Sequence, residues 1–580
     1  MCSTLGMAGS GWREGSWARR AHDLGVSWLA LTALTAAAAL TGCSQAHSDA
    51  DVDAAVAGPR QGPPESVFQR ERRIEVNIEL TQADWELLRF EGRTLAQQQE
   101  EPPPPFSYTG FRGRVLVDGV LHRDVEVRKK GYIGSLSTLR PSLRLDFDPD
   151  REGLLSGLRR LTLNSDVQDR SHARQCMALD LLAAAGVPAS HCAFAHVVVN
   201  GVDLGTYSNV EPITGRMLRR FWSDDEGPLY EGTTADLDRA SWQQLELESN
   251  GPTDHAQLQQ LVAALEASNE TLVSELEAIV DLERFRNFWA METLLGHWDG
   301  YAGNRNNYYL FFSPDSQRFE FIPWGLDQAF VGRRQFESGF YDITVYARSR
   351  LARRLYDVPE QRALFRQRLG ELNDQLWNES TLLAQADAIA ALTPDAAPDA
   401  TDAHREFLRT HGAALRAALA QPAPEIADTP EPPPPNCPLS QSPIGGTFST
   451  AWQSDAEGFA DVQIQLDGGP VPITFYPSMI ADPDPTRATL FFYGPLEDDR
   501  SVQLQVLLPR QFLAPGSYRF HSGETLGVAG AVTADGAYTL LGLFGDGELR
   551  FSRAGTTPNA PVTGEFHAMM YQTACLGATE

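Results

Sequence analysis

Three polar side chains in the middle of the chain have the types and the order that chemistry on phosphate needs. In "GHWDGYAGNRNNYYLFF", Asp299 and Asn304 lie five positions apart, and Asp327 follows in "IPWGLDQAFVG". Phosphoryl transfer requires a carboxylate that orients the attacking hydroxyl, oxygen ligands for a divalent metal and cations on the phosphates. Two carboxylates and an amide supply the first two of these requirements.

Each of these residues also has a structural interpretation. An aspartate between Trp298 and a glycine at a helix end is often only a turn former, and this applies to Asp299 taken alone. Trp298 and Trp324 are assigned to packing rather than to a nucleotide platform. Asn306 and Asn307 are assigned to the hairpin that follows them.

A series of motifs that runs from Arg73 to Gly332 makes the catalytic interpretation more specific. It opens with "VNIELTQADWELL", a strand followed by a helix that begins at Thr81. It continues with an Asp118-Gly119 hairpin and a basic strand, Val127–Gly131, and ends with the Asp299 and Asp327 segments. The series resembles the spore coat protein H (CotH) kinase family. Two further family segments, "LN...D.S..R" and "NG...G.Y...E", are matched by Leu163, Asn164, Asp169, Ser171, Arg174, Asn200, Gly201, Gly205, Tyr207 and Glu211.

The resemblance implies a role for each central residue. Asp299 is expected to be the catalytic carboxylate, which accepts the proton of the substrate hydroxyl. Asn304 and Asp327 are expected to bind Mg²⁺ or Mn²⁺ through oxygen, as hard cations prefer. ATP is the expected co-substrate.

The resemblance also points to cations for the nucleotide phosphates. Arg128 and Lys130, with Arg140 or Arg144, are the candidates, and Glu211 is expected to orient one of them. The alternative interpretation of the basic run from 128 to 130 is an exposed strand edge protected against pairing.

Two departures from the family pattern bear on activity. Gly325 stands where relatives carry the first aspartate of "PWD.D", and Arg140 stands where they carry lysine, which meets phosphate as a compact point charge. Three functions follow in order of preference. The first is a secreted or cell-envelope kinase-like phosphotransferase acting on Ser or Thr of an envelope protein. The second is a catalytically inactive member that binds or assembles envelope proteins. The third is a metal-dependent hydrolase.

The predicted fold class is α+β, with an atypical protein kinase-like domain, a Pro-rich linker and an all-β, sandwich-like domain. Alternating strands, hairpins at Asp-Gly and Asn-Gly, and helices after 349 predict the first domain. The predicted boundaries are a signal peptide at 1–42, a disordered tether at 43–65, the kinase-like domain at 66–420, the linker at 421–436 and the β domain at 437–580.

The amino terminus predicts export and lipidation. Arg19 and Arg20 precede an apolar run that ends in Leu40-Thr41-Gly42-Cys43, a layout typical of a secretory signal. The end of the run resembles a bacterial lipobox, in which Cys43 takes the lipid. The alternative is a buried helix with a chance cysteine. The expected location is the cell envelope, anchored in a membrane, and Ser44 after the cysteine favours the outer membrane.

Four cysteines then remain for the exported protein, an even number in an oxidising compartment. The simplest pairing joins Cys176 with Cys192 and Cys437 with Cys575. The formal net charge of -28 argues against nucleic acid as a partner, because so acidic a surface repels phosphate backbones. The expected partner is an envelope or secreted protein substrate.

Overall fold

A computed structural model of the chain describes residues 67–573 with gaps. The chain divides into two compact units: a central unit, described from residue 67 to residue 426, and a carboxyl-terminal unit, described from residue 439. The gaps in the description are at 94–96, 98–105, 132–136, 148–157, 234, 249–254, 332–340, 427–438, 455–457, 467–468, 471–472, 482–486, 497–500, 521–524 and 534–537.

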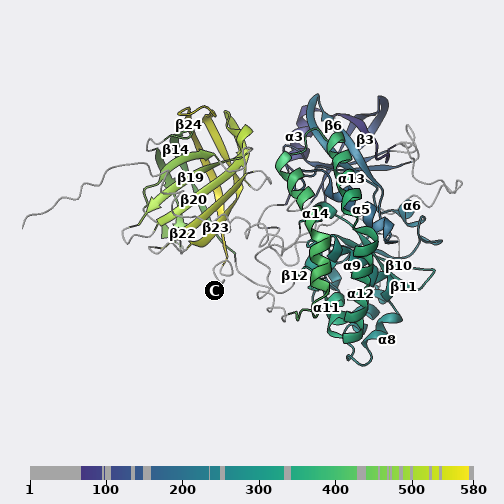
Figure 1. The fold of residues 1–580 in the computed structure, drawn as a ribbon. Helices are drawn as coiled ribbons and strands as arrows, with labels where there is room; N and C mark the ends of the chain where they lie inside the picture. Colours follow the sequence, from purple (N-terminus) through teal and green to yellow (C-terminus); the bar gives the residue numbers. More distant parts are fainter. Residues whose placement is uncertain are drawn as a thin grey trace, which may run out of the picture. The chain divides into compact units, whose positions relative to one another are not determined.

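A closed barrel of seven strands forms one end of the central unit (Figure 1). Strands β1 and β6 pair in parallel, and the other neighbouring strands pair antiparallel. In order around the barrel the strands are β1 (Arg73–Glu79), β2 (Gly110–Val117), β3 (Val120–Lys130), β4 (Ser142–Asp146), β5 (Arg160–Asn164), β7 (Val202–Val210) and β6 (Cys192–Val199).

Local sequence signals determine how the barrel strands are connected. The predicted hairpin turns are confirmed: Asp118 and Gly119 have φ of 49° and 80°, and Asn200 and Gly201 have φ of 50° and 80°. Both residues of such a tight turn need positive φ, which Asp-Gly and Asn-Gly tolerate. Thr81 caps α3 (Gln82–Phe90) by accepting a hydrogen bond from the Asp84 amide, as the sequence predicts.

The alternation of side chains along β3, β4 and β5 gives the barrel one apolar and one polar face. Val125 and Val127 of β3 lie in the buried core with the leucines of β4 and β5. The alternate positions, Glu126, Arg128 and Lys130, point away from that core because successive side chains of a strand face opposite sides. Lys130 therefore faces the remainder of the central unit.

Helix α5 (Arg174–Ala184) lies between the barrel and the helical end of the unit (Figure 1). Seven of its eleven residues are buried. A disulfide joins Cys176 of α5 to Cys192 of β6, with 5.1 Å between the Cα atoms, which confirms this predicted pair. Cys43, Cys437 and Cys575, like the predicted signal peptide and tether, lie outside the described residues.

The other end of the central unit contains a four-stranded sheet and a helical layer. Helix α9 (Leu282–Leu294) packs against α12 (Pro359–Leu376), where the Trp289 and Phe365 rings stack at 3.7 Å between centroids. The sheet order is β11 (Arg318–Pro323), β10 (Tyr308–Ser313), β8 (Leu229–Gly232) and β9 (Glu246–Leu247). The helices are α6 (Gly215–Leu218), α7 (Ala256–Ala264), α8 (Leu272–Glu277), α9 (Leu282–Leu294), α10 (Tyr301–Asn304), α11 (Arg350–Asp357), α12 (Pro359–Leu376), α13 (Glu379–Leu392) and α14 (Pro398–Leu419), with a small ribbon of β12 (Tyr341–Asp342) and β13 (Val345–Tyr346).

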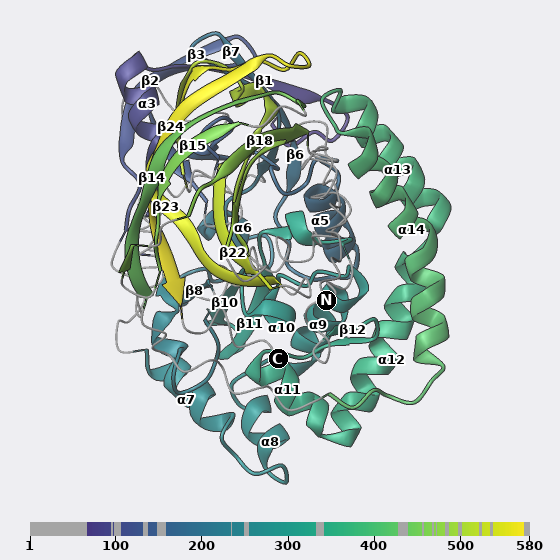
Figure 2. The same ribbon diagram turned by 90° about the vertical axis from the view of Figure 1, so that its left-hand side faces the viewer.

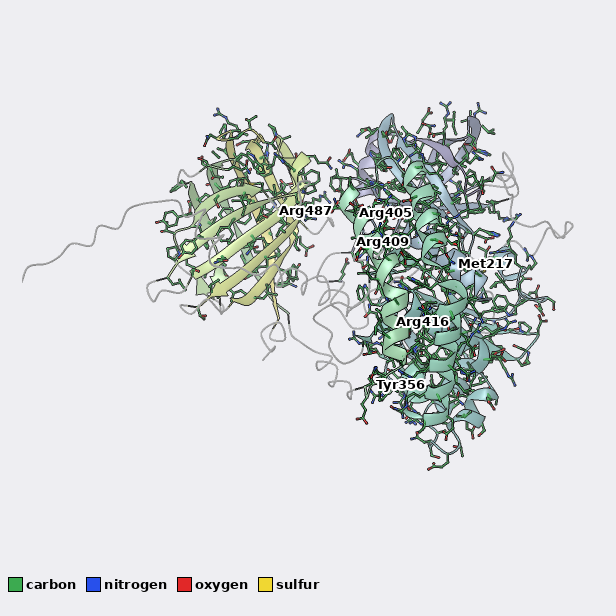
Figure 3. All side chains as sticks on the ribbon, in the orientation of Figure 1. Met217, Tyr356, Arg405, Arg409, Arg416 and Arg487 are labelled. Carbon is green, nitrogen blue, oxygen red and sulfur yellow. A yellow bond between two sulfur atoms is a disulfide. The ribbon has the colours of Figure 1, made fainter. Side chains whose placement is uncertain are left out.

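Helices α13 and α14 lie side by side (Figure 2). Three arginines follow the length of α14 (Figure 3), and each is paired with an acidic side chain: Arg405 with Asp387 and Asp402, Arg409 with Glu406, and Arg416 with Asp374. These pairs offset the positive charge of the arginines. Among the described helices, none has the length and apolar character needed to cross a bilayer.

The carboxyl-terminal unit is all β, but the described residues form one sheet rather than the two stacked sheets of the predicted sandwich. Its end strands meet through a bridge between Ala460 and Phe475, so the sheet curls on itself. The strands of this nine-stranded sheet are β15 (Phe459–Gln463), β14 (Leu439–Ala451), β24 (Pro561–Thr573), β23 (Tyr538–Arg553), β22 (Leu526–Val532), β20 (Ser501–Pro509), β19 (Arg487–Pro495) and β18 (Tyr476–Ala481), with β21 (Gly516–Arg519) beside β23 and a separate ribbon of β16 (Gln465–Leu466) and β17 (Gly469–Pro470).

Candidate functional site

The segment that carries Asp299 is held by a buried glutamate. Glu292, near the end of α9, accepts hydrogen bonds from the backbone amides of Tyr301 and Ala302, both at 2.8 Å. It thereby caps the short helix α10, and burial raises its pKa to about 8. A Cβ atom at Gly300 would lie 2.2 Å from the Glu292 Oε1, so the residue after Asp299 must be glycine for this cap to form.

Three asparagine side chains hold the carboxylate of Asp299. The Asn304 Nδ2 donates to Oδ1 at 2.6 Å, and the Asn306 Nδ2 approaches the same oxygen at 3.4 Å. The Asn307 Nδ2 donates to Oδ2 and to the Asp299 backbone carbonyl, each at 3.0 Å. The structure therefore brings Asp299 and Asn304 into direct contact. Asn307 serves the hairpin as predicted, since its carbonyl accepts from the Trp324 amide, and its side chain in addition orients Asp299.

Asp327 lies on the single turn Leu326–Gln328 that follows β11. Its pKa is raised to about 7, mainly by burial and in addition by the negative charges of Asp299, Asp166 and Asp169, against the opposing charge of Arg174. Asp327 and Asp299 are thus close enough to interact, although they come from opposite ends of the β10–β11 hairpin. Asp166 had no signal in the sequence, and Asp169 was noted only as part of a motif.

Lys130, on strand β3 of the barrel, interacts electrostatically with the carboxylates of Asp327 and Asp166. Its Nζ donates to the Asn164 Oδ1 at 2.5 Å and lies 5.4 Å from the centroid of the Trp324 ring. Asn164 is held in turn by Gln175 of α5, to which its Nδ2 donates at 3.0 Å. Burial lowers the pKa of Lys130 to about 8, while nearby carboxylates, Asp327 among them, oppose that shift.

Of the other predicted cations, Arg144 acts electrostatically on Lys130. Its Nε donates to Asp146 at 2.7 Å. Arg128 is directly opposite Arg144 in the ladder between β3 and β4, and it is paired with Glu126. The polar face of these two strands therefore carries a run of charges that leads to Lys130.

Arg140 and Glu211 have contacts elsewhere. The Arg140 Nη2 donates to the Thr206 carbonyl at 2.6 Å, and its guanidinium lies over the Tyr207 ring. The Glu211 Oε2 accepts from the Arg220 Nη2 at 2.5 Å. The expectation that Glu211 orients one of the four predicted cations is therefore wrong, because a different arginine takes its carboxylate.

The oxygen donors of this site fit a hard divalent cation. Asp327 is held among carboxylates that raise its pKa, an arrangement in which a cation relieves repulsion. In the parts of the chain that the structure describes, no three His, Cys, Asp or Glu side chains are grouped as a complete metal-binding set. Magnesium commonly uses one or two carboxylates and keeps several waters, so Asp327 with the Asn304 amide and one further oxygen meets its needs.

Comparison with known proteins identifies the family. The family whose description reads "CotH kinase protein" matches residues 127–419, about half of the chain. The chain belongs to the CotH kinase family. The matched region begins in β3, ends in α14 and contains Lys130, Asn164, Asp299 and Asp327.

Three named relatives are similar to this CotH domain. Invasin CotH2 of Rhizopus delemar is 25% identical over 39% of this chain and 43% of its own length, and Invasin CotH3 of the same organism is 25% identical over 37% and 40%. The inner spore coat protein H of Bacillus subtilis is 26% identical over 30% of this chain and 50% of its own length. The matches span half or less of each relative.

Proposed function

We propose that the CotH domain is a kinase-like phosphotransferase that moves the γ-phosphate of ATP to a Ser or Thr of an envelope or secreted protein. The observation that carries this proposal is the convergence of Lys130, Asp299 and Asp327, which come from the barrel, from the turn after α9 and from the turn after β11. These residue types are the parts that phosphoryl transfer needs.

In this proposal Asp299 accepts the proton of the substrate hydroxyl, and the amides of Asn304 and Asn307 keep its carboxylate in one orientation. Asp327 and the Asn304 side chain hold Mg²⁺ or Mn²⁺. The bound metal supplies charge neutralisation for the triphosphate. Lys130 and Arg144 face the phosphates from the barrel.

The proposed location is the cell envelope. Two relatives are named as invasins and a third as an inner spore coat protein, names that place those proteins at cell or spore surfaces. The expected leader and the lipid anchor at Cys43 complete the proposal of a protein held at a membrane with its CotH domain outside the cytoplasm.

Gly325 favours a second function, that of an inactive CotH protein which binds or assembles envelope proteins. The family pattern has an aspartate where this chain has Gly325, so one carboxylate is missing from the neighbourhood of Asp327. An inactive member of the family would keep the fold and bind its protein partner, but it would not transfer phosphate to it.

Magnesium-dependent ATP binding and transfer by the full chain separate the two functions. The wild type is expected to bind ATP only with Mg²⁺ or Mn²⁺, and Asp327→Ala should abolish this binding. Asp299→Asn should keep ATP binding and lower transfer of radiolabelled phosphate by about 100-fold or more. A wild type that binds no ATP supports the inactive member and contradicts the first proposal.

A further inference from the structure

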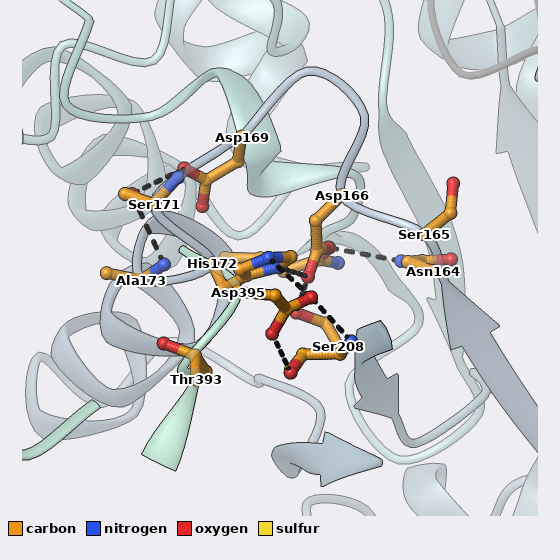
Figure 4. Close-up of polar contacts among 12 residues, drawn as sticks. Asn164, Ser165, Asp166, Asp169, Ser171, His172, Ala173, Ser208, Thr393 and Asp395 are labelled. Carbon is orange, nitrogen blue, oxygen red and sulfur yellow. Dashed lines mark hydrogen bonds and ion pairs between the residues drawn. The ribbon is translucent and has the colours of Figure 1, made fainter. Parts of the chain in front are cut away.

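One oxygen of the buried Asp166 carboxylate is hydrogen-bonded, and the other, here called the bare oxygen, has no hydrogen-bond partner among the described residues. The residue follows β5 and is 5% exposed. Its Oδ2 is held by the His172 Nδ1 at 3.0 Å and by the Ser208 Oγ, which donates at 2.9 Å (Figure 4). Its Oδ1 is buried and has no hydrogen-bond partner among the described residues.

The contacts that hold Asp166 come from several separate elements. His172 precedes α5 and Ser208 belongs to β7. The other ring nitrogen of His172 lies 3.6 Å from Asp395, which sits in the connection between α13 and α14. Asp395 is itself fixed by the Thr206 amide at 2.8 Å and the Thr206 hydroxyl at 2.5 Å. A network of this extent holds the carboxylate plane of Asp166 in one orientation.

The bare oxygen is costly to the protein by itself. A buried carboxylate oxygen without a hydrogen bond or cation loses its hydration without compensation. Asp166 and His172 also have φ of 53° and 56°, in the left-handed region that few residues other than glycine adopt and in which Asp, Asn and His are the commonest of those few. Strained backbone and unsatisfied buried polar atoms both concentrate at functional sites.

The position of Asp166 indicates what its bare oxygen meets. The charge of Asp166 acts on the carboxyl of Asp327 and on the ammonium of Lys130, so the three side chains belong to one group of buried charges. The ammonium of Lys130 donates its hydrogen bond to the neutral Asn164, and Glu231 and Asp327 act on its charge as well. Among the described residues, the Oδ1 of Asp166 therefore has no protein partner within a group that is rich in carboxylates.

We propose that Asp166 is a further cation ligand of this CotH domain, with Oδ1 as the binding oxygen, Asp327 as the neighbouring ligand, and His172 and Ser208 as positioning residues. The inference rests on the proposed function, because it concerns the divalent cation that Asp327 binds there. It adds a carboxylate to the set of two carboxylates and one amide predicted from the sequence.

The test is Mn²⁺ binding to the full chain without nucleotide, measured by calorimetry and by the Mn²⁺-dependent shift in Tm. Asp166→Asn keeps the size of the side chain and removes its charge. We expect Mn²⁺ affinity to fall by at least about 10-fold. The metal-free Tm should rise or stay unchanged, because the variant removes a buried charge with one unpaired oxygen and keeps an oxygen for His172 and Ser208. A merely structural partner of His172 would give the opposite result: a lower metal-free Tm with unchanged Mn²⁺ affinity.

Asp236→Asn is the matched control. Asp236 is 3% exposed, but both of its oxygens are hydrogen-bonded: Oδ1 accepts from the Leu237 amide at 2.7 Å and Oδ2 from the Arg350 amide at 2.8 Å. Its replacement is expected to lower Tm and leave Mn²⁺ affinity unchanged. Ser208→Ala, which removes only one donor to Asp166, is expected to weaken Mn²⁺ binding by a few-fold and gives a second measurement if Asp166→Asn does not fold.

The outcomes separate this inference from the proposed function. One outcome is that the wild type binds Mn²⁺, Asp327→Asn does not, and Asp166→Asn and Ser208→Ala bind it as tightly as the wild type. In that case the Asp166 inference is overturned and the proposed cation site at Asp327 stands. If the wild type binds no Mn²⁺, both are overturned.

Discussion

The side chain of Asn307 fills the space that a side chain at Gly325 would need. Gly325 has a φ of 51°, and a Cβ atom there would lie 2.2 Å from the Asn307 Oδ1. The Trp324 amide also donates to the Asn307 carbonyl at 3.1 Å. With Asn307 in this position, the turn that carries Asp327 fits against the turn that carries Asp299 because residue 325 has no side chain. An aspartate at position 325, as in the family pattern, would require the Asn307 side chain to move.

Gly325→Ala should destabilise the protein more than an alanine at another left-handed glycine. The left-handed backbone alone costs about 1–2 kcal/mol for an L residue, and the contact with Asn307 adds to it. Gly186→Ala is the control, since Gly186 has a φ of 78° with nothing within 4 Å of the added Cβ. Urea unfolding measures both variants. Equal losses of unfolding free energy in the two variants would show that the Asn307 side chain moves aside freely. In an Asn307→Gly background, the additional destabilisation of Gly325→Ala should disappear.

Asn307→Ala should slow phosphate transfer without weakening ATP binding. It removes two hydrogen bonds from Asp299, each of 3.0 Å, and leaves Lys130 and Asp327 in place. A catalytic carboxylate that loses its orientation costs about 10–100-fold in turnover. Single-turnover transfer and ATP titration measure the two properties separately. Asn306→Ala, which removes only a 3.4 Å contact, is the control and should have a smaller effect.

Local sequence signals predicted the elements that position the site. The hairpin turns at Asp118-Gly119 and Asn200-Gly201 and the Thr81 cap depend on two to four adjacent residues, and the structure contains them all. The Cys176–Cys192 pair was also predicted, as the simplest pairing within the central domain among the four remaining cysteines, and the structure contains it.

Contacts between distant segments could not be predicted in this way. Asp166 is held by His172, which is close in the sequence, but also by Ser208, which is 42 residues away. No local sequence pattern indicates that one oxygen of a carboxylate will have no partner. Glu211 was assigned to the wrong cations because a motif does not state which of many arginines meets it. The carboxyl-terminal sheet curls because its two ends are joined by a bridge between Ala460 and Phe475. The alternation of apolar and polar residues along each strand does not predict this, because it is the same in a curled sheet and in a sandwich.

The Cys176–Cys192 disulfide should stabilise the central unit by about 3 kcal/mol, the value expected from loop closure for a ring of this size. Cys176→Ser/Cys192→Ser should lower the urea midpoint, and the reductant sensitivity of the wild-type midpoint should largely disappear in this variant. Cys437→Ser/Cys575→Ser is the control and should keep that sensitivity. An unchanged midpoint in the first variant would contradict the prediction.

Glu292 should make the stability of the metal-free protein fall as the pH rises from about 4.5 to about 8. Its pKa is about 8 in the folded protein and near 4.5 when exposed, so the folded state holds a proton that the unfolded state has released. The stabilisation is complete below the pKa of the unfolded state and is lost as the pH rises towards the pKa of the folded state, with a limiting slope of about 1.4 kcal/mol per pH unit.

Glu292→Gln removes this titration while keeping one acceptor for the Tyr301 and Ala302 amides. The unfolding free energy of the wild type should therefore fall relative to that of the variant across this pH range, so that the difference between them narrows or changes sign. Urea unfolding at several pH values measures that difference, and a difference that stays constant from pH 5 to pH 8 would show that Glu292 is ionised in the folded protein throughout.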